Sequence, residues 1–207
     1  MRSFVGLGIA IVALTFAGCA QNIVQVRDLG AGTGEPLALK RVAVAPFRSA
    51  PRAGAAALPA DAASLVASYV AEGFGTRGVD TIPSSDVASA LGSAEIGADL
   101  SSAIAVARDK FGADALVAGT VHRFRNRDGQ AMGSANPSSV GFEVKIYRAA
   151  DGKLLWSAIF DHTQVALGAN ALTAAQYPGG GTRWLTSEEL ARWGAQRLVN
   201  EVPLAAK

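Results

Sequence analysis

Apolar and polar residues alternate along several short stretches of the chain, with the period of two that is typical of half-buried β-strands. In the longest stretch, from residue 140 to 147, valine, phenylalanine and isoleucine alternate with glycine, glutamate, lysine and tyrosine, which indicates a sheet with one covered face. Asp151-Gly152 follows it and is a hairpin-turn signal. Strands are predicted over residues 41–47, 79–82, 115–124, 139–148 and 153–162.

Between these strands, apolar residues recur every three or four positions, which predicts amphipathic helices. The first helix is expected to end in the glycine-rich segment 73–78, and the last begins with two glutamates in its first turn. The order of elements predicts a single α/β domain over residues 41–207, with a mixed sheet of about five strands and helices packed on it. Helices are predicted from residue 62, after Pro83, from Leu100 and after Thr186.

The first 18 residues form a separate segment. Arg2 precedes an apolar run over residues 4–16, and the small residues Ala17 and Gly18 lead into Cys19. A basic start, an apolar stretch of roughly 7–15 residues and small residues at the end describe a secretory signal peptide. The run is shorter than the ~20 residues that span a bilayer. The segment Leu14-Thr15-Phe16-Ala17-Gly18-Cys19 resembles the lipobox of bacterial lipoproteins.

That resemblance implies lipid on Cys19 and cleavage before it. Cys19 is the only cysteine, so it has no disulfide partner within the chain. Two or three acyl chains on this residue would give stable anchoring. The alternative is ordinary cleavage that leaves a soluble periplasmic protein. In a Gram-negative host, alanine rather than aspartate at position 20 implies the periplasmic face of the outer membrane.

Residues 20–40 are expected to be a flexible tether after the lipidated cysteine, because they include a glycine-rich segment and lack apolar periodicity. About 20 such residues reach ~70 Å at full extension. The domain is therefore expected to stay close to its membrane.

Charge and motifs do not point to nucleic acid or to catalysis. A formal net charge of +2 gives no electrostatic footprint for nucleic acid. Neither His122 nor His162 belongs to an HExxH motif, and no serine stands in a G-x-S-x-G elbow. Residues 73–78 match G-x-G-x-x-G, but they follow a predicted helix and precede a strand, the reverse of a dinucleotide site. We predict no enzymatic activity, no metal and no cofactor.

The segments RVAVAPF, VDTIPSSDVASAL, IAVARDKFGADALVAGTV and FEVKIYRAADGKLLWSAIFDH resemble one superfamily of bacterial envelope proteins. It includes the curli-secretion channel lipoprotein, the lipoprotein activators of penicillin-binding proteins, and the amino-terminal domain of TolB. The resemblance spans roughly residues 41–202. Its motifs are structural, so it implies the α/β fold more directly than a task.

Two surface segments are candidates for partner binding. Arg123, Arg125 and Arg127 alternate with uncharged residues and give a small basic edge that suits lipid headgroups or an acidic partner; the alternative is a solvated strand end. Tyr177, Arg183 and Trp184 lie in a glycine-rich loop and are residue types favoured in binding hot spots. The alternative is that the tryptophan holds the final helix on the sheet.

The predicted function is that of a membrane-anchored periplasmic lipoprotein that binds another envelope protein without catalysis. Control of peptidoglycan synthases is one form of it that the resemblance implies. The alternative is an oligomeric component or accessory of an outer-membrane secretion or export system. Membrane-spanning strands would alternate between apolar and polar residues, and residues 124–139 and 163–177 show no clear alternation, which argues against a pore.

Overall fold

The computed structural model describes residues 23–28, 36–52, 56–92, 99–166 and 168–205. The predicted signal peptide and Cys19 lie outside the described residues. Nine strands, five helices and one short 3-10 helix are assigned within the described part of the chain.

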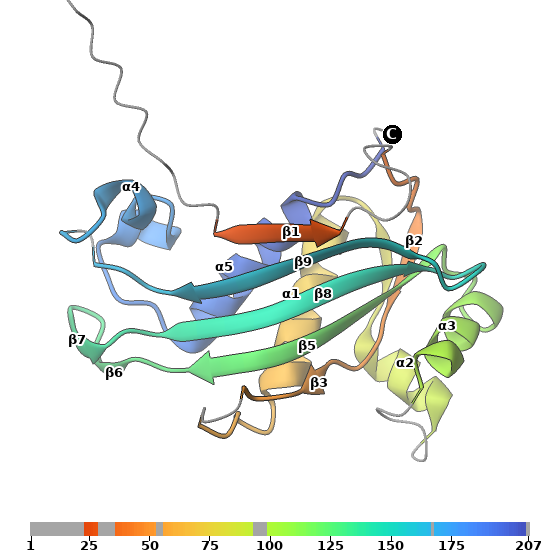
Figure 1. Ribbon diagram of the computed structural model, residues 1–207, viewed down its shortest axis with the longest axis horizontal. Coiled ribbons are helices and arrows are strands. Elements are labelled where there is room, and N and C mark those ends of the chain that lie inside the picture. The colour runs from red at the N-terminus through yellow and green to blue at the C-terminus, as the bar shows by residue number, and fades with distance from the viewer. Residues whose placement is uncertain (1–22, 29–35, 53–55, 93–98, 167, 206–207) are drawn as a thin grey trace, which may run out of the picture.

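Seven strands form one mixed sheet in the order β1-β9-β8-β5-β2-β4, with β3 beside β5 (Figure 1). Strands β2, β3 and β4 run parallel to their neighbours, whereas β8, β9 and β1 each run antiparallel to the strand beside them. The strands are β1 (Val24–Asp28), β2 (Arg41–Val44), β3 (Arg48–Ser49), β4 (Asp80–Ile82), β5 (Ala115–Arg125), β8 (Ser139–Arg148) and β9 (Leu154–Thr163). A separate hairpin consists of β6 (Asp128–Gln130) and β7 (Gly133–Asn136).

Helices cover the sheet unequally. The long helices α1 (Ala62–Thr76) and α5 (Ser187–Asn200) lie side by side across one face, behind the sheet in Figure 1. The short helices α2 (Ser84–Leu91) and α3 (Leu100–Asp109) pack on the other face, mainly over β2 and β5, with Ile82 of β4 and Tyr147 of β8 at the margin of the cluster. No helix of the described residues covers the rest of that face.

Strand alternation explains this division. Val42, Val117 and Phe142 point into the main core beneath α1 and α5, together with the buried Trp156 and Phe160. The intervening residues point the opposite way. Ala43 and Leu116 meet α2 and α3, and the half-exposed Tyr147 packs against the same cluster, whereas Glu143 and Lys145 lie on the uncovered part and are half-exposed.

The predicted α/β class is confirmed, and all five predicted strands are present. The first helix extends through Gly73 and Gly75 to Thr76 before the chain turns at Gly78 with φ of 74°. Gly73 suits this helix because an added Cβ would lie 3.1 Å from Val199 of α5. The prediction missed β1, β3 and the β6–β7 hairpin.

The expected tether is wrong where it covers β1. Val24–Asp28 pairs antiparallel with β9 and forms one edge of the sheet. Ile23 is buried, and Leu37 forms a bridge with Leu204 near the other end of the chain. The segment lacks apolar periodicity because an edge strand needs only a few apolar contacts, and its main-chain hydrogen bonds to β9 supply the rest.

Candidate interaction surface

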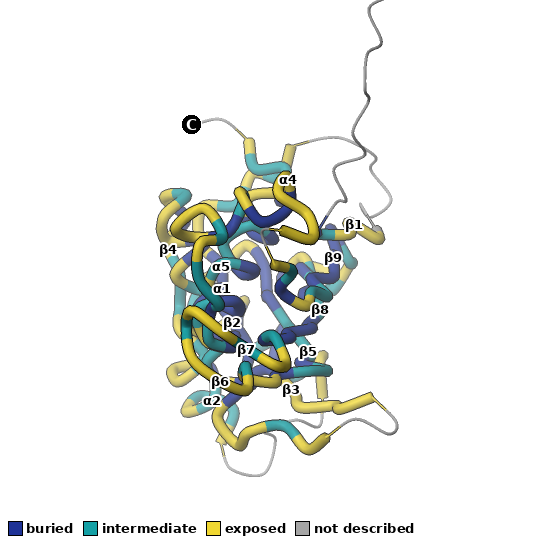
Figure 2. Tube along the Cα trace, turned by 90° about the vertical axis from the view of Figure 1, so that its left-hand side faces the viewer, coloured by how far each residue is buried: buried dark blue, intermediate teal, exposed yellow. Residues whose placement is uncertain are grey.

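Both predicted binding segments lie at one end of the sheet. Strand β5 ends, β8 begins and β9 ends at this end because β5 and β9 both run antiparallel to β8, which lies between them. The β6–β7 hairpin connects β5 to β8, and a loop with α4 (Ala171–Ala174) and η1 (Pro178–Gly181) connects β9 to α5. We call residues 125–139, 163–166 and 168–189 the loop end. It lies on the left in Figure 1 and faces the viewer in Figure 2.

Hydrogen bonds join the two predicted segments into one surface. Arg127 Nη1 donates to the Trp184 carbonyl over 3.1 Å, and the Trp184 N–H donates to the Ala131 carbonyl over 2.7 Å. The Ser187 N–H donates to Asn126 Oδ1 over 3.1 Å. The basic edge and the aromatic loop are therefore two sides of the same structure, although nearly 50 residues separate them in the sequence.

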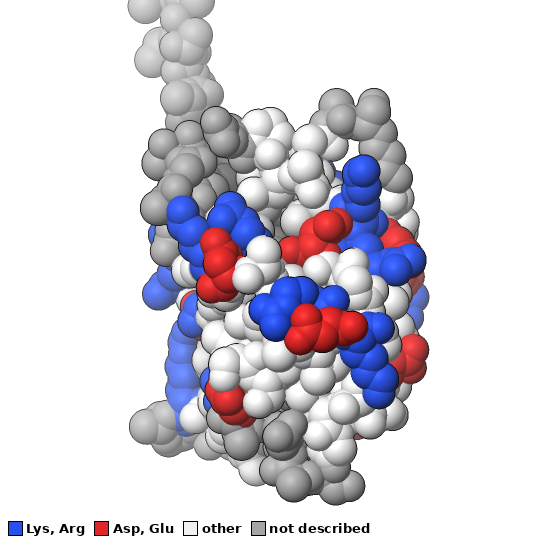
Figure 3. All heavy atoms as spheres, turned by 90° about the vertical axis from the view of Figure 1, so that its right-hand side faces the viewer, with Lys and Arg blue, Asp and Glu red and all other residues white. Residues whose placement is uncertain are grey.

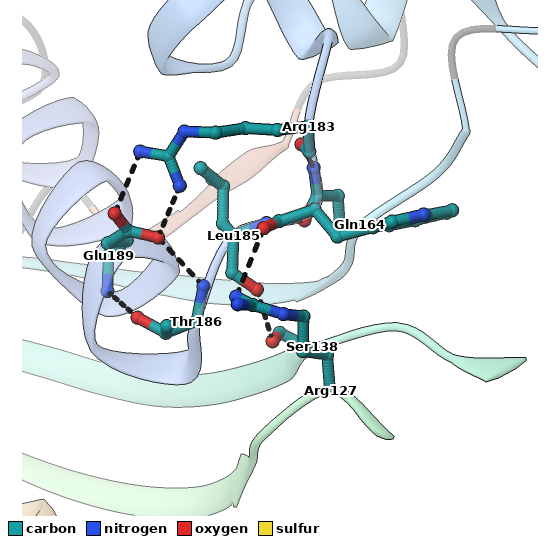
Figure 4. Close-up of polar contacts among 8 residues, drawn as sticks. Arg127, Ser138, Gln164, Arg183, Leu185, Thr186 and Glu189 are labelled. Carbon is teal, nitrogen blue, oxygen red and sulfur yellow. Dashed lines mark hydrogen bonds and ion pairs between the residues drawn. The ribbon is translucent and has the colours of Figure 1, made fainter. Parts of the chain in front are cut away.

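Buried polar side chains fix the stretch that enters α5 (Figure 4). Gln164 receives the Leu185 N–H over 2.7 Å and donates to the Arg183 carbonyl over 2.9 Å. Ser138 Oγ donates to the Leu185 carbonyl over 2.7 Å. Because Gln164 and Ser138 are almost fully buried, their hydrogen bonds have no competition from solvent, and they hold the chain between the ends of β8 and β9.

Arg183 is occupied within the chain. Its two terminal nitrogens donate to the Glu189 carboxylate over 2.8 and 2.7 Å (Figure 4). Glu189 and Thr186 also form a capping box at the start of α5. The hydrogen bond from Arg183 is the main reason that the pKa of Glu189 falls to about 2. Arg183 thus stabilises the helix start and leaves only part of its side chain for a partner.

Tyr177 does not lie on the surface, so the prediction that it contacts a partner is wrong. It is 3% exposed and packs edge-on against Trp193 of α5 at 5.0 Å between ring centroids. Its hydroxyl lies 2.5 Å from His162 Nε2 and accepts the Val165 N–H over 3.1 Å. Burial is the main reason that the pKa of His162 falls to about 4, so the imidazole is neutral at pH 7.

The predicted basic edge is largely neutralised. Arg123 pairs with Asp161, and Arg52 pairs with the same carboxylate at 2.8 Å. Arg127 lies partly buried against the Trp184 carbonyl. Arg125 remains exposed, with one contact to the Pro137 carbonyl at 3.3 Å. The solvated strand end, the alternative to a basic binding edge, fits Arg125 alone.

Exposed apolar residues at the loop end were not predicted. Met132 in the β6–β7 turn is 83% exposed, and Leu172 on α4 is 69% exposed. Beside the hairpin lies a shallow pocket of about 170 Å³ lined by Met132, Val165 and Trp184, among others. A single apolar residue in a polar segment carries no periodicity, so sequence patterns could not reveal this surface.

A larger pocket of about 240 Å³ lies on the uncovered sheet face, where α3 begins. Charged groups of both signs line it, and two of them, Lys145 and Glu143, pair at 3.0 Å. Tyr147 and Leu100 contribute apolar surface. Alternation predicted that Glu143, Lys145 and Tyr147 share an open face, but the pocket depends on α3, which is distant in sequence.

The described residues contain no group of three or more His, Cys, Asp or Glu side chains that could hold a metal ion. His122 Nδ1 lies 3.1 Å from the Ala50 carbonyl, and His162 is bound to Tyr177. None of the described helices has the length and apolar character needed to cross a membrane.

No protein-family model matches the sequence, and no curated protein matches it significantly. Among solved structures, it is similar to two structures of the PelC dodecamer from Paraburkholderia phytofirmans, with 16% and 18% identity and TM-scores of 0.54 and 0.55. These likenesses cover 88% and 89% of this chain and 98% of PelC.

Two further structures are more distant. Lipoprotein GNA1162 from Neisseria meningitidis has 18% identity and a TM-score of 0.43, over 60% of this chain and 81% of that one. The LpoB C-terminal domain from Salmonella enterica has 13% identity and a TM-score of 0.41, over 64% and 87%. At 16% and 18% identity the PelC comparisons establish the fold alone: the chain has the α/β architecture of PelC.

Proposed function

We propose that this chain is a lipid-anchored, non-catalytic protein of the bacterial envelope that works as a homo-oligomer, as a component or accessory of an outer-membrane export system. The lipobox-like segment ending at Cys19 supports the anchor. The observation that carries the oligomer is the likeness to PelC, which spans 98% of a chain solved as a dodecamer.

Features of the chain itself are compatible with self-association. Strand β1 leaves one side of the sheet without a partner strand among the described residues, and such an edge is a site at which another chain can pair. Among the described residues, no helix covers the second sheet face over Glu143 and Lys145 of β8, which are half-exposed. A ring of identical subunits needs two different complementary patches on each subunit.

The adaptor function, with control of peptidoglycan synthases as one form, stays a prediction. Its structural support would come from the LpoB domain, and that likeness is distant. A protein that binds one envelope partner as a monomer is the outcome that would favour it.

The test is the mass of the lipidated protein extracted from membranes in detergent, measured by native mass spectrometry. The expected result is one discrete multiple of the protomer mass. Protomer mass at every concentration, together with an envelope enzyme captured by cross-linking in cells, would replace the oligomer with the adaptor.

The anchor is tested separately with Cys19→Ala. The variant is expected to leave the membrane fraction. A processed form of the variant that remains with the membrane would contradict the lipid anchor.

A further inference from the structure

The distance between the lipidated cysteine and the folded domain is short. Because β1 begins at Val24 and Ile23 is already buried in the core, only three residues lie between Cys19 and the described domain. Four residue steps span at most about 14 Å. The 20-residue tether expected from the sequence would reach about 70 Å. A lipid anchor on Cys19 therefore keeps the start of β1 next to the bilayer.

The register of β1 shows which end of the molecule lies next to the bilayer when Cys19 is lipidated. Val24 lies opposite Phe160, three residues before β9 ends at Thr163. Strand β1 therefore begins at the loop end, beside the segment that leads to α4. In Figure 1, β1 starts on the left and its arrow points away from α4 and the β6–β7 hairpin.

The loop end also carries the most exposed apolar side chains. Met132 and Leu172 are far more exposed than Val26 and Leu100, the other large hydrophobic residues exposed in the described chain. They lie on two separate projections, the β6–β7 turn and α4, which flank the end of the sheet in Figure 2. Apolar residues on projecting turns beside a lipid anchor can enter the boundary between headgroups and acyl chains.

The opposite end has a different surface. Figure 3 shows basic and acidic side chains next to one another there. Strand direction places three ion pairs at this end, where β2, β4 and β5 begin and β8 ends: Arg41–Asp80 at 2.5 Å, Arg108–Asp109 at 2.7 Å and Arg148–Asp151 at 3.0 Å. Such paired charges suit water and would be costly to dehydrate against lipid.

We propose that the loop end is a membrane-contact surface: lipid on Cys19 holds the domain end-on, with Met132 and Leu172 in the interfacial region of the bilayer. The inference rests on the proposed lipid anchor. The loop end contains three basic residues and three acidic residues, Arg125, Arg127, Arg183, Asp128, Glu188 and Glu189, so the contact is apolar and does not depend on anionic lipid.

The test uses fluorescence quenching from within the bilayer. Lipidation consumes the only native thiol, so a second cysteine can be labelled uniquely with bimane. Met132→Cys, Leu172→Cys and the control Ala150→Cys, exposed in the β8–β9 turn at the far end, are prepared in the full lipidated protein. Each is placed in vesicles of phosphatidylethanolamine and phosphatidylglycerol that contain doxyl-labelled phosphatidylcholine.

Quenching at positions 132 and 172 is expected to exceed that at 150 by about twofold or more, and to change little when phosphatidylglycerol is omitted. Equal quenching at all three positions overturns the proposal. Protection of 132 and 172 from aqueous iodide without quenching by doxyl lipid also overturns it, because a protein then covers them. Vesicle flotation tests the lipid anchor separately from the membrane contact of the loop end. Failure of the lipidated protein to float with the vesicles contradicts the anchor itself.

Discussion

The hydroxyl of Tyr177 holds the loop that follows β9. This hydroxyl contacts the side chain of His162, near the end of β9, and the main-chain N–H of Val165, just after it. The two contacts tie the Tyr177 segment to the end of the strand. The residue type predicts a binding side chain, because tyrosine in a glycine-rich loop is common at interfaces. The same amphipathic ring is equally suited to a core with one internal polar partner.

Tyr177→Phe is expected to lower the free energy of unfolding by about 1–3 kcal/mol, because it leaves a buried N–H and an imidazole nitrogen without their partner. Urea denaturation measures the change. Tyr147→Phe is the matched control, since the Tyr147 hydroxyl has no hydrogen bond to any described residue and its ring is half-exposed. Equal losses in the two variants would contradict the role of the Tyr177 hydroxyl.

His162 makes stability depend on pH. Burial holds its pKa at about 4, with Arg123 and Arg197 acting in the same direction and Asp161 against them. An unfolded histidine has a pKa near 6.5, so the unfolded state binds more protons between these values. Neutral His162 therefore contributes fully to the free energy of unfolding above pH 6.5. This contribution is lost as pH falls towards 4, by at most about 3 kcal/mol.

Urea denaturation at pH steps from 7 to 5 tests this, because most carboxylates titrate below that window. The free energy of unfolding of the wild type should fall with pH across it. His162→Gln is expected to flatten the profile. A parallel profile in wild type and variant would mean that another group causes the dependence.

At the scale of elements, close approaches decide which residues are allowed. Phe47 follows β2 and covers Gly119 of β5, so that a Cβ at position 119 would lie 2.2 Å from the Phe47 ring. Glycine is required at position 119 by this close contact with the Phe47 ring rather than by its backbone angles. The strand pattern predicted β5 but gave no reason for a glycine in its middle.

Gly119→Ala is expected to destabilise the domain by about 1–3 kcal/mol through overpacking. The double variant Phe47→Leu/Gly119→Ala should lose less than the sum of the two single variants, because the smaller side chain makes room. Gly133→Ala is the control, since a Cβ there meets nothing within 4 Å. Thermal unfolding reports all four variants, and additive losses would contradict the proposed steric cause.

The pattern of apolar and polar residues along the sequence predicted the elements that bury much of their surface. Strand β8 alternates visibly because one of its faces is covered and the other is partly open. Strands β5 and β9 are buried over consecutive residues, so they stand out as apolar runs instead. The β6–β7 hairpin is almost wholly exposed, so no apolar alternation marks it. Strand β1 is short and lies at the edge, where pairing with β9 rather than side-chain burial defines it.

For the molecule as a whole, the length of chain between the lipid and the sheet determines how the domain is oriented on the bilayer. Insertion of about ten glycine and serine residues after Asn22 should leave the fold and the membrane attachment unchanged, because both the anchor and β1 are retained. Quenching by doxyl lipid at position 132 is expected to fall towards that at 150. Undiminished quenching at 132 would mean that Met132 and Leu172 bind lipid without help from the anchor.

Oligomerisation and membrane orientation are properties of this same scale, and they constrain each other. A closed ring of lipid-anchored subunits presents the same end of every subunit to the bilayer. The loop end would then form one rim of the assembly, with Met132 and Leu172 repeated around it. The end of the sheet opposite the loop end, which carries the Arg148–Asp151 ion pair, would form the other rim.

The sequence by itself determined the α/β class, five of the strands and the four main helices, because burial of one face imposes a period that is visible in any single element. It also indicated the lipobox-like segment, which acts through local recognition. Tertiary structure decided the rest. Whether Tyr177 faces solvent, whether Arg183 is free and where the first strand after Cys19 begins depend on contacts with β9 and α5. Those partners are distant in sequence, and no local pattern records them.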